Sequence, residues 1–237
     1  RVPGSDSSLL EAKAIGADVR IVYSVADAVE MAKKEAEKQF VFSAVGFETT
    51  APITAVEALD DLPKNFSFLV SHRLIPPAME LLLGVEDLQI DGFIAPGHVS
   101  AIIGLKPYEL FTKVYRMPTV VAGFEPNNVL MAIYMILKQH STSDARLENE
   151  YSRVVKPEGN IKAQDIMRKA FTVTAGNWRG IGKLDNSALQ LKESLAEYDA
   201  RKKYALKASQ GKDIHAGCQC HQVIVGKIKP NQCPLFL

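Results

Sequence analysis

The sequence predicts an α/β protein, in which a Rossmann-like parallel sheet with helices on both faces precedes a mostly helical, cysteine-containing C-terminal domain. Short apolar runs alternate with amphipathic segments through the first 140 residues, in five successive cycles. Each run has the length of a strand and ends in a turn with glycine, proline or polar residues, which is typical of a parallel sheet covered by helices. We therefore expect an α/β domain over residues 1–140 and a helical domain over residues 141–237.

The first cycles show this order most clearly. Residues 18–23 are expected to form a strand, and Ser24 is expected to cap a helix over 25–38 whose apolar positions share one face. Residues 40–45 are almost continuously apolar, as strands buried on both faces of a parallel sheet are. The segment Gly-Phe-Glu-Thr-Thr then leads into a helix expected over 51–59.

The later elements follow from the same periodicity. Further strands are expected at residues 66–70, 92–95 and 119–122. The helices after them are expected to open at Pro76 and Pro77, to cover 99–103 and to cover 128–138. A polar linker is expected at 140–144, followed by helices over 147–155, 163–171 and 188–204, with a glycine-rich turn at 178–182.

Composition argues against several classes of partner. The 237 residues carry 28 basic and 27 acidic side chains, so no strong field favours nucleic acid or an acidic membrane. No apolar run approaches the roughly 18 residues of a membrane span, and none resembles a signal peptide. Three cysteines without a spread-out framework are typical of a reducing compartment, which predicts a cytoplasmic protein. Since the chain opens on Arg1, we expect it to be part of a longer protein.

Two common chemistries lack their motifs. No turn has the spacing of a phosphate-binding loop or of a dinucleotide-binding glycine motif. The Gly-x-Ser-x-Gly segment of α/β-hydrolases does not occur either. Nucleotide binding and serine-hydrolase chemistry therefore lose most of their support.

Polar and ionisable residues gather in the turns after the predicted strands. They are Glu48, Thr49, Thr50, His72, His98, Ser100 and Glu125. Ligands of open parallel sheets bind outside the carboxyl ends of the strands, so these side chains are expected to converge on one crevice.

The alternative for these residues is a structural role at helix N-termini. Thr49 and Ser100 are more simply explained as caps of free N–H groups, and Thr50 could act in the same way. Glu48 and Glu125 each follow a Gly-Phe dipeptide, and a carboxylate at a helix N-terminus is an equally good interpretation.

Capping does not call for histidine, so His72 and His98 favour a functional site. Of the two, His72 is expected to matter more, because nothing evident in its turn requires an imidazole.

The three cysteines, Cys218, Cys220 and Cys233, all lie close to the C-terminal end. Clustered thiolates suit soft metals and iron–sulfur clusters, but a [4Fe–4S] cluster takes four ligands. Three interpretations stay open. They are a cluster completed from outside the chain, a structural zinc site with His215 or His221 as fourth ligand, and a redox dithiol, which would lack its usual Cys-x-x-Cys spacing.

A set of short segments is distributed along the whole chain as a combined signature. They are R-V-P-G-S, G-F-E-T-T-A-P, S-H-x-x-x-P-P-A-M, I-D-G-F-I-A-P-G-H-V-S, V-A-G-F-E-P, E-N-x-Y-x-R-V-V, G-N, W-R-G-I-G and G-C-x-C…C-P-L-F. Taken together, these segments resemble the HypD family of hydrogenase maturation proteins. The resemblance runs from the first residue to the last, and the combination of motifs is specific.

This resemblance implies an assembly scaffold more than a free-standing enzyme. Family members assemble the Fe(CN)2CO part of the [NiFe]-hydrogenase active site, with iron, cyanide and carbon monoxide as cargo. Their partners are the chaperone HypC and HypE, which delivers cyanide as a protein thiocyanate. No nucleic-acid or membrane partner is expected. The alternatives are a small-molecule α/β enzyme that uses the histidines and glutamates of the turns, or a zinc-stapled binding module.

The resemblance also implies a [4Fe–4S] cluster, with Cys218, Cys220 and Cys233 as candidate ligands. The family's first α/β domain, with its G-C-P-V-C motif, and a cysteine-rich tail would lie outside this chain. His221 stands where the family usually has glycine after C-x-C, which leaves the fourth ligand open.

Overall fold

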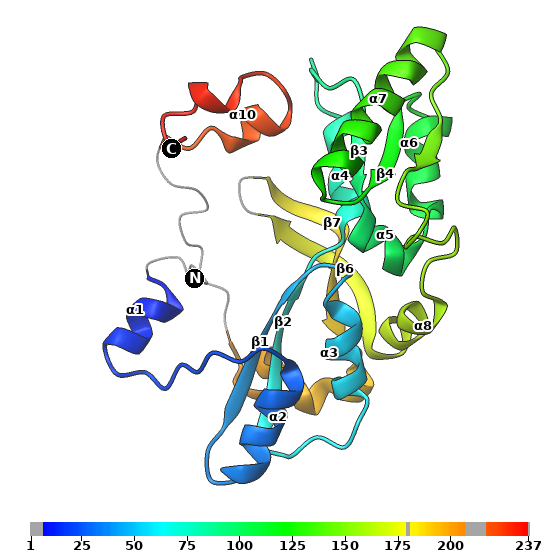
Figure 1. Cartoon of the computed structure of the whole chain (residues 1–237). Helices are drawn as coiled ribbons and strands as arrows, with labels where there is room; N and C mark the ends of the chain where they lie inside the picture. The colour runs from blue at the N-terminus through cyan, green and yellow to red at the C-terminus, as the bar shows by residue number, and fades with distance from the viewer. Residues whose placement is uncertain (1–6, 179–180, 207–216, 237) are drawn as a thin grey trace.

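The computed structural model describes residues 7–178, 181–206 and 217–236, and the statements below refer to these ranges. Two lobes are visible in Figure 1, each built around a small parallel sheet. The first sheet pairs β1 (Phe40–Gly46) with β2 (Phe66–His72). The second has the order β3 (Phe93–Pro96), β4 (Thr119–Ala122) and β5 (Leu147–Asn149). The α/β class with parallel strands is thus confirmed.

The first lobe packs α2 (Val25–Lys34) and α3 (Ala51–Ala58) against β1 and β2. The start of α2 is fixed locally, because Ser24 and Asp27 form a capping box in which each side chain accepts the other's backbone N–H. Alanines of both helices are fully buried, so the helices approach the phenylalanines of β2 closely. Pro52 lies in the first turn of α3, where it costs no hydrogen bond.

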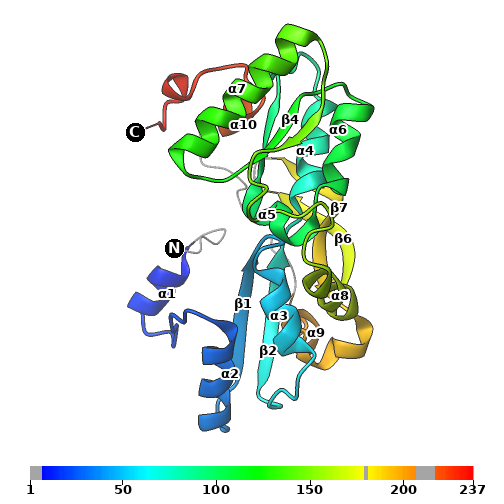
Figure 2. The ribbon, with the colours of Figure 1, turned by 45° about the vertical axis from the view of Figure 1, so that its right-hand side comes forward.

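The second lobe surrounds its sheet with a larger set of helices, shown at the top of Figures 1 and 2. These are α4 (Ile75–Leu83), α5 (Gly97–Ile103), η1 (Lys106–Tyr108), α6 (Glu109–Lys113) and α7 (Pro126–Thr142). Its core contains the buried rings of Phe93, Tyr108, Phe111 and Tyr151. This lobe therefore has a hydrophobic core of its own.

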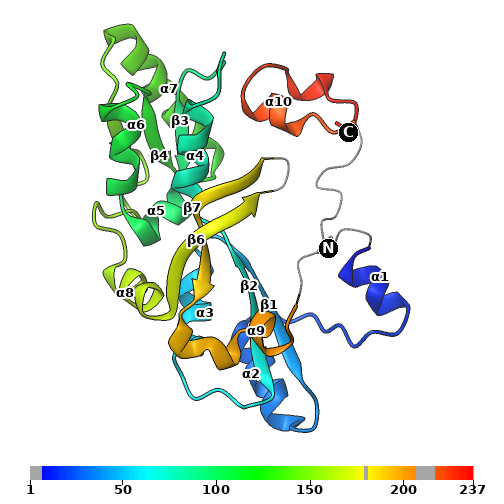
Figure 3. The ribbon, with the colours of Figure 1, turned by 180° about the vertical axis from the view of Figure 1, so that it is seen from behind.

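A long β-hairpin follows the second lobe and returns to the first. It begins after α8 (Ile161–Ala170) and pairs β6 (Phe171–Trp178) with β7 (Gly182–Leu191) in antiparallel fashion. Figure 3 shows the two strands crossing the region where the lobes meet. Phe171 and Leu189 belong to the same core as β2 and α3, so the hairpin completes the first lobe.

The remaining elements are short. They are α1 (Leu9–Ala14), η2 (Glu193–Tyr198), α9 (Ala200–Lys203), α10 (Cys220–Ile224) and η3 (Pro230–Gln232). Within the described ranges, no helix combines the length and the apolar character needed to cross a bilayer.

Four sequence-based expectations are wrong. Residues 18–23 form no strand, because Ile21 and Tyr23 are 79% and 100% exposed and have no sheet to join. The expected linker at 140–144 is instead largely the end of α7. The segment 147–155 contains β5 and turns in place of a helix. The segment 188–204 holds the end of β7, η2 and α9, because packing on β2 overrides its helix-like spacing.

The single Rossmann-like sheet is corrected as well, since the described strands form separate parallel sheets in the two lobes. A domain boundary at residue 140 stays a prediction. Residues on both sides of it share cores, as when β5 pairs with β4 and Phe171 packs with α3.

Candidate functional site

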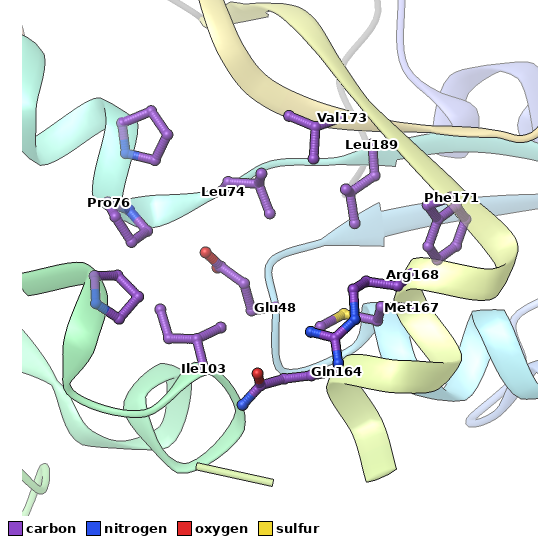
Figure 4. A pocket seen from close by; sticks show the side chains of 12 residues that line it. Glu48, Leu74, Pro76, Ile103, Gln164, Met167, Arg168, Phe171, Val173 and Leu189 are labelled. Carbon is purple, nitrogen blue, oxygen red and sulfur yellow. The ribbon is translucent and has the colours of Figure 1, made fainter. Parts of the chain in front are cut away.

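Glu48 is the most unusual of the predicted site residues. It follows β1, yet its side chain is only 2% exposed. Its Oε1 accepts a hydrogen bond of 2.9 Å from the N–H of Ile75, the first residue of α4, whereas its Oε2 makes no hydrogen bond within the described residues. Burial raises the pKa of this carboxyl to about 7, partly opposed by the Ile75 N–H. Figure 4 shows the carboxyl directed among apolar side chains. Both the protonated and the ionised form of this carboxyl are therefore populated near neutral pH.

His72 does not lie in an open turn, as the sequence suggested, but ends β2 inside the core. It is 1% exposed, its Nε2 lies 3.1 Å from Thr54 Oγ1, and its ring meets Phe171 edge to face at 5.9 Å. Burial lowers its pKa to about 4, and the nearby Arg73 charge adds to the shift. The imidazole is therefore neutral at physiological pH. Its packing gives it a structural role that the sequence did not reveal.

His98 differs, because it lies exposed in the first turn of α5. Its ring meets Phe124 edge to face at 4.7 Å and Tyr151 at 6.1 Å between centroids. Glu125 is the N-cap residue of α7, and its carboxylate lies 3.3 Å from the Arg153 guanidinium at the surface. These two candidates remain accessible to a ligand.

The structural alternative fits Glu48, whose Oε1 accepts the N–H of Ile75 at the start of α4, but the hydroxyls of Thr50 and Ser100 cap no helix N–H. Thr50 takes the N-cap position of α3, but its hydroxyl donates to Phe47 O at 3.2 Å and caps no helix N–H. Thr49 is exposed and lies one residue before this position. Ser100 is buried, donates to Pro96 O at 2.9 Å and lies 3.3 Å from Tyr108 Oη. Glu125 likewise makes no side-chain capping bond.

The predicted residues are only partly brought together. Burial raises the pKa of Tyr108, the charge of Glu48 adds to this, and Ser100 Oγ lies 3.3 Å from Tyr108 Oη, so these three residues are the ones that the structure links. The pocket beside Glu48 is not lined by His72, His98 or Glu125. Convergence of all seven residues on one crevice therefore stays a prediction.

The cysteines lie near one another. Cys220 begins α10 and is exposed, Cys218 is half-buried, and Cys233 is buried after η3. A hydrogen bond with Cys218 raises the pKa of the Cys220 thiol, and the charges of Cys218 and Cys233 contribute to the same shift. None of the three forms a disulfide. One backbone contact between this segment and the second lobe is the 3.1 Å hydrogen bond from Gln89 N to Val225 O.

The three cysteine thiols are chemically suitable ligands for an iron–sulfur cluster or for zinc, because both bind soft sulfur donors. Among the residues that the structure describes, however, no three His, Cys, Asp or Glu side chains are grouped as a metal site would be. His221 is exposed on α10, and His215 lies outside the described residues. The thiols are thus close together without forming a complete ligand shell.

Sequence reasoning missed the aromatic and polar neighbours of these turns. Trp178 packs against Phe47 with ring centroids 6.2 Å apart, and its indole N–H donates to Ser187 Oγ at 2.8 Å. Arg73 also reaches the hairpin through two bonds to Asn177 O. The available signal was the single tryptophan of the chain beside a glycine-rich turn.

Comparison with known proteins places this geometry in context. All of residues 1–237 match the HypD family model, described as "Hydrogenase formation hypA family". A putative hydrogenase expression/formation protein of Methanocaldococcus jannaschii is 49% identical over 239 residues, which cover 100% of this chain and 66% of the relative. The hydrogenase maturation factors HypD of Rhizobium leguminosarum and Escherichia coli are 42% and 40% identical over 247 and 240 residues, covering 100% of this chain and 64% of each relative. The chain therefore spans about two thirds of the length of these relatives.

Proposed function

The chain belongs to the HypD family, and on that premise we propose that it is part of a scaffold for assembling the Fe(CN)2CO moiety of [NiFe]-hydrogenase. The observation that carries this proposal is the family match over all 237 residues, which includes the C-terminal cysteine motif. The assembly of the Fe(CN)2CO moiety, its cargo and its partners are inferred from the family resemblance.

In this proposal Cys218, Cys220 and Cys233 hold a [4Fe–4S] cluster, with a fourth ligand from outside this chain. Their mutual proximity supports the assignment, since thiolates must converge to bind one group. Such a cluster supplies electrons for the reductive transfer of cyanide to iron. Cys220 and Cys233 are the first choices as ligands, and Cys218 is either a ligand or a redox partner beside them.

The βα turns are proposed to hold the cyanide-bearing iron, which is the substrate of the assembly. His98 is exposed and can donate a hydrogen bond to a cyanide nitrogen. His72 is buried, so the same role would require β2 and α3 to separate locally. His98 is therefore the better placed of the two histidines.

The proposed partners are a HypC-like chaperone and a HypE-like cyanide donor, both from the family resemblance. A cytoplasmic location belongs to the same proposal, because thiols that bind a cluster must stay reduced.

Anaerobic reconstitution of the longer natural protein with iron and sulfide tests the cluster. We expect a brown species with broad thiolate-to-iron absorption, which Cys220→Ala and Cys233→Ala abolish. Ser152→Ala, at an exposed serine outside the cysteine segment, is the control and should leave the absorption unchanged. Binding of one zinc and no iron by the natural protein would replace this proposal with the zinc-stapled module.

A further inference from the structure

A pocket of about 260 Å³ lies beside Glu48 where the lobes meet. Figure 4 shows apolar side chains around it from several elements, including Leu74, Pro76, Ile103, Met167, Phe171 and Leu189. Because they come from α4, α5, α8 and the β6–β7 hairpin, the pocket exists only when the lobes are assembled. The cysteines proposed for the cluster and the histidines considered for the iron cargo do not line it.

The polar groups of this pocket are not equivalent. The Gln164 amide donates to the carbonyls of Ile102 and Glu158, at 2.8 Å each, and Arg168 pairs with Asp165. Glu48 Oε2, by contrast, is buried and makes no hydrogen bond within the described residues. A buried carboxylate oxygen without a partner is costly, so a natural partner for it is expected.

We propose that this pocket binds a small, uncharged, largely apolar molecule that carries one hydroxyl group, which pairs with Glu48. The walls are apolar, so burying a hydrocarbon group against them removes apolar surface from water and favours binding. A hydroxyl both donates and accepts, so it can pair with the carboxylate as donor and with the acid as acceptor. The pKa of Glu48, about 7, means that both forms are present at neutral pH.

The volume limits the size of the ligand. Sites for drug-sized ligands usually measure roughly 300–1,000 Å³, and an apolar cavity of about 150 Å³ accommodates benzene. At about 260 Å³, this pocket suits a single ring or a short branched chain. A charged ligand fits less well, because an anion would face Glu48 and a cation would lose water against apolar walls.

Phenol and benzene form a matched pair of probes, since they differ only in the hydroxyl group. The 237-residue chain would be titrated with each while methyl resonances of Ile103, Met167 and Leu189 are followed by NMR. We expect saturable shifts, with phenol bound roughly tenfold more tightly than benzene because of one hydrogen bond to a partly charged group. In Glu48→Met this preference should fall to about one, since the apolar side chain offers no partner.

Val173→Phe supplies a test that leaves Glu48 intact, because Val173 lines the pocket and is half-exposed on β6. The added ring should fill the pocket and weaken the binding of both probes at least tenfold, because each probe can then bury less apolar area. Val41→Phe is the matched control, a similarly exposed strand valine away from the pocket, and should change neither affinity. The proposal that the pocket binds such a ligand would be overturned by an absence of saturable shifts in the wild type. It would also be overturned if both phenylalanine variants weakened probe binding equally. Equal affinities for phenol and benzene in the wild type would overturn the role of Glu48.

Discussion

Burial shifts the pKa values of two side chains, Glu48 and His72, in opposite directions. Burial disfavours the charged form of each, so the pKa of the acid rises from 4.5 to about 7 and that of the imidazole falls from 6.5 to about 4. Both residues are therefore stabilised as neutral groups. Since their titration ranges overlap, their effects on stability oppose each other.

We predict that two substitutions will separate these effects. Glu48 favours folding below pH 4.5, and this contribution of about 3 kcal/mol is lost as the pH rises through 7. His72 favours folding above pH 6.5, and a similar contribution of about 3 kcal/mol is lost as the pH falls through 4. Relative to wild type, Glu48→Gln should therefore lose stability on acidification, and His72→Gln should lose it as the pH rises.

Urea unfolding of the three proteins at several pH values between 4 and 7.5 measures this. The difference in unfolding free energy between each variant and wild type removes the contribution of the other groups. If Glu48→Gln runs parallel to wild type across this range, the carboxyl is not held neutral by burial.

At the scale of elements, the β6–β7 hairpin links the turn after β1 to the rest of the first lobe. Trp178 of β6 contacts Phe47, and its N–H is satisfied by Ser187 of β7. The Ser187 hydroxyl in turn donates to Leu184 O at 2.7 Å. Ser187 is fully buried, so this small network fixes where the hairpin meets the Gly-Phe-Glu turn.

Removing that hydroxyl should loosen the hairpin. Ser187→Ala leaves the indole N–H without its partner, which costs about 1–3 kcal/mol of stability. The tryptophan is unique in the chain, so its fluorescence reports the change directly, as a shift of the emission maximum. Ser152→Ala, at an exposed serine, should change neither the emission nor the stability. An unchanged emission maximum in Ser187→Ala would contradict the proposed network.

The elements also show what sequence patterns could and could not predict. The strands β1, β2 and β4 and the start of α2 were predicted closely, because continuous apolar runs and a capping serine are local signals. The β6–β7 hairpin was missed, since β7 buries consecutive residues, Ser187, Ala188 and Leu189, in place of a strict alternation.

For the candidate site, position was more predictable than environment. Glu48 and His98 follow strands as expected, but the burial of Glu48 depends on α4, and pocket-lining side chains come from α8, distant in sequence. The depth of His72 follows from Phe171 of β6, an element the sequence did not predict. Long-range packing of this kind leaves no local pattern, so it could not be predicted from residue spacing.

On the scale of the whole molecule, two passages of the chain between the lobes lie within the described residues 7–178. The first crossing, from β2 to α4, is held by the hydrogen bond from Leu74 N to Ser187 O, at 2.9 Å. At the second, the segment before α8 lies against the end of α5, where Asn160 N donates to Ile102 O and Leu105 N to Pro157 O. Figure 2 shows α5 and α8 on either side of this junction. The relative position of the lobes therefore depends on close backbone approach.

Two glycines permit this approach. Gly104 and Gly159 both have positive φ, at 77° and 70°, and face each other across the second crossing. A Cβ on Gly159 would lie 2.4 Å from Gly104 N and 2.5 Å from Ile102 O, and neither backbone atom can turn away as a side chain would. Larger residues are excluded here by the neighbouring chain as well as by their own conformation.

Gly159→Ala should therefore disturb the junction more than its backbone conformation alone requires. Gly182→Ala is the matched control, because its φ is also positive, at 97°, but its Cβ would meet nothing within 4 Å. The control should cost about 1–2 kcal/mol for the left-handed conformation, and Gly159→Ala about 3–5 kcal/mol, because the crossing must also separate. Urea unfolding at constant pH measures both free energies. Equal losses in the two variants would show that the crossing tolerates a Cβ, and would contradict the role given to the two glycines.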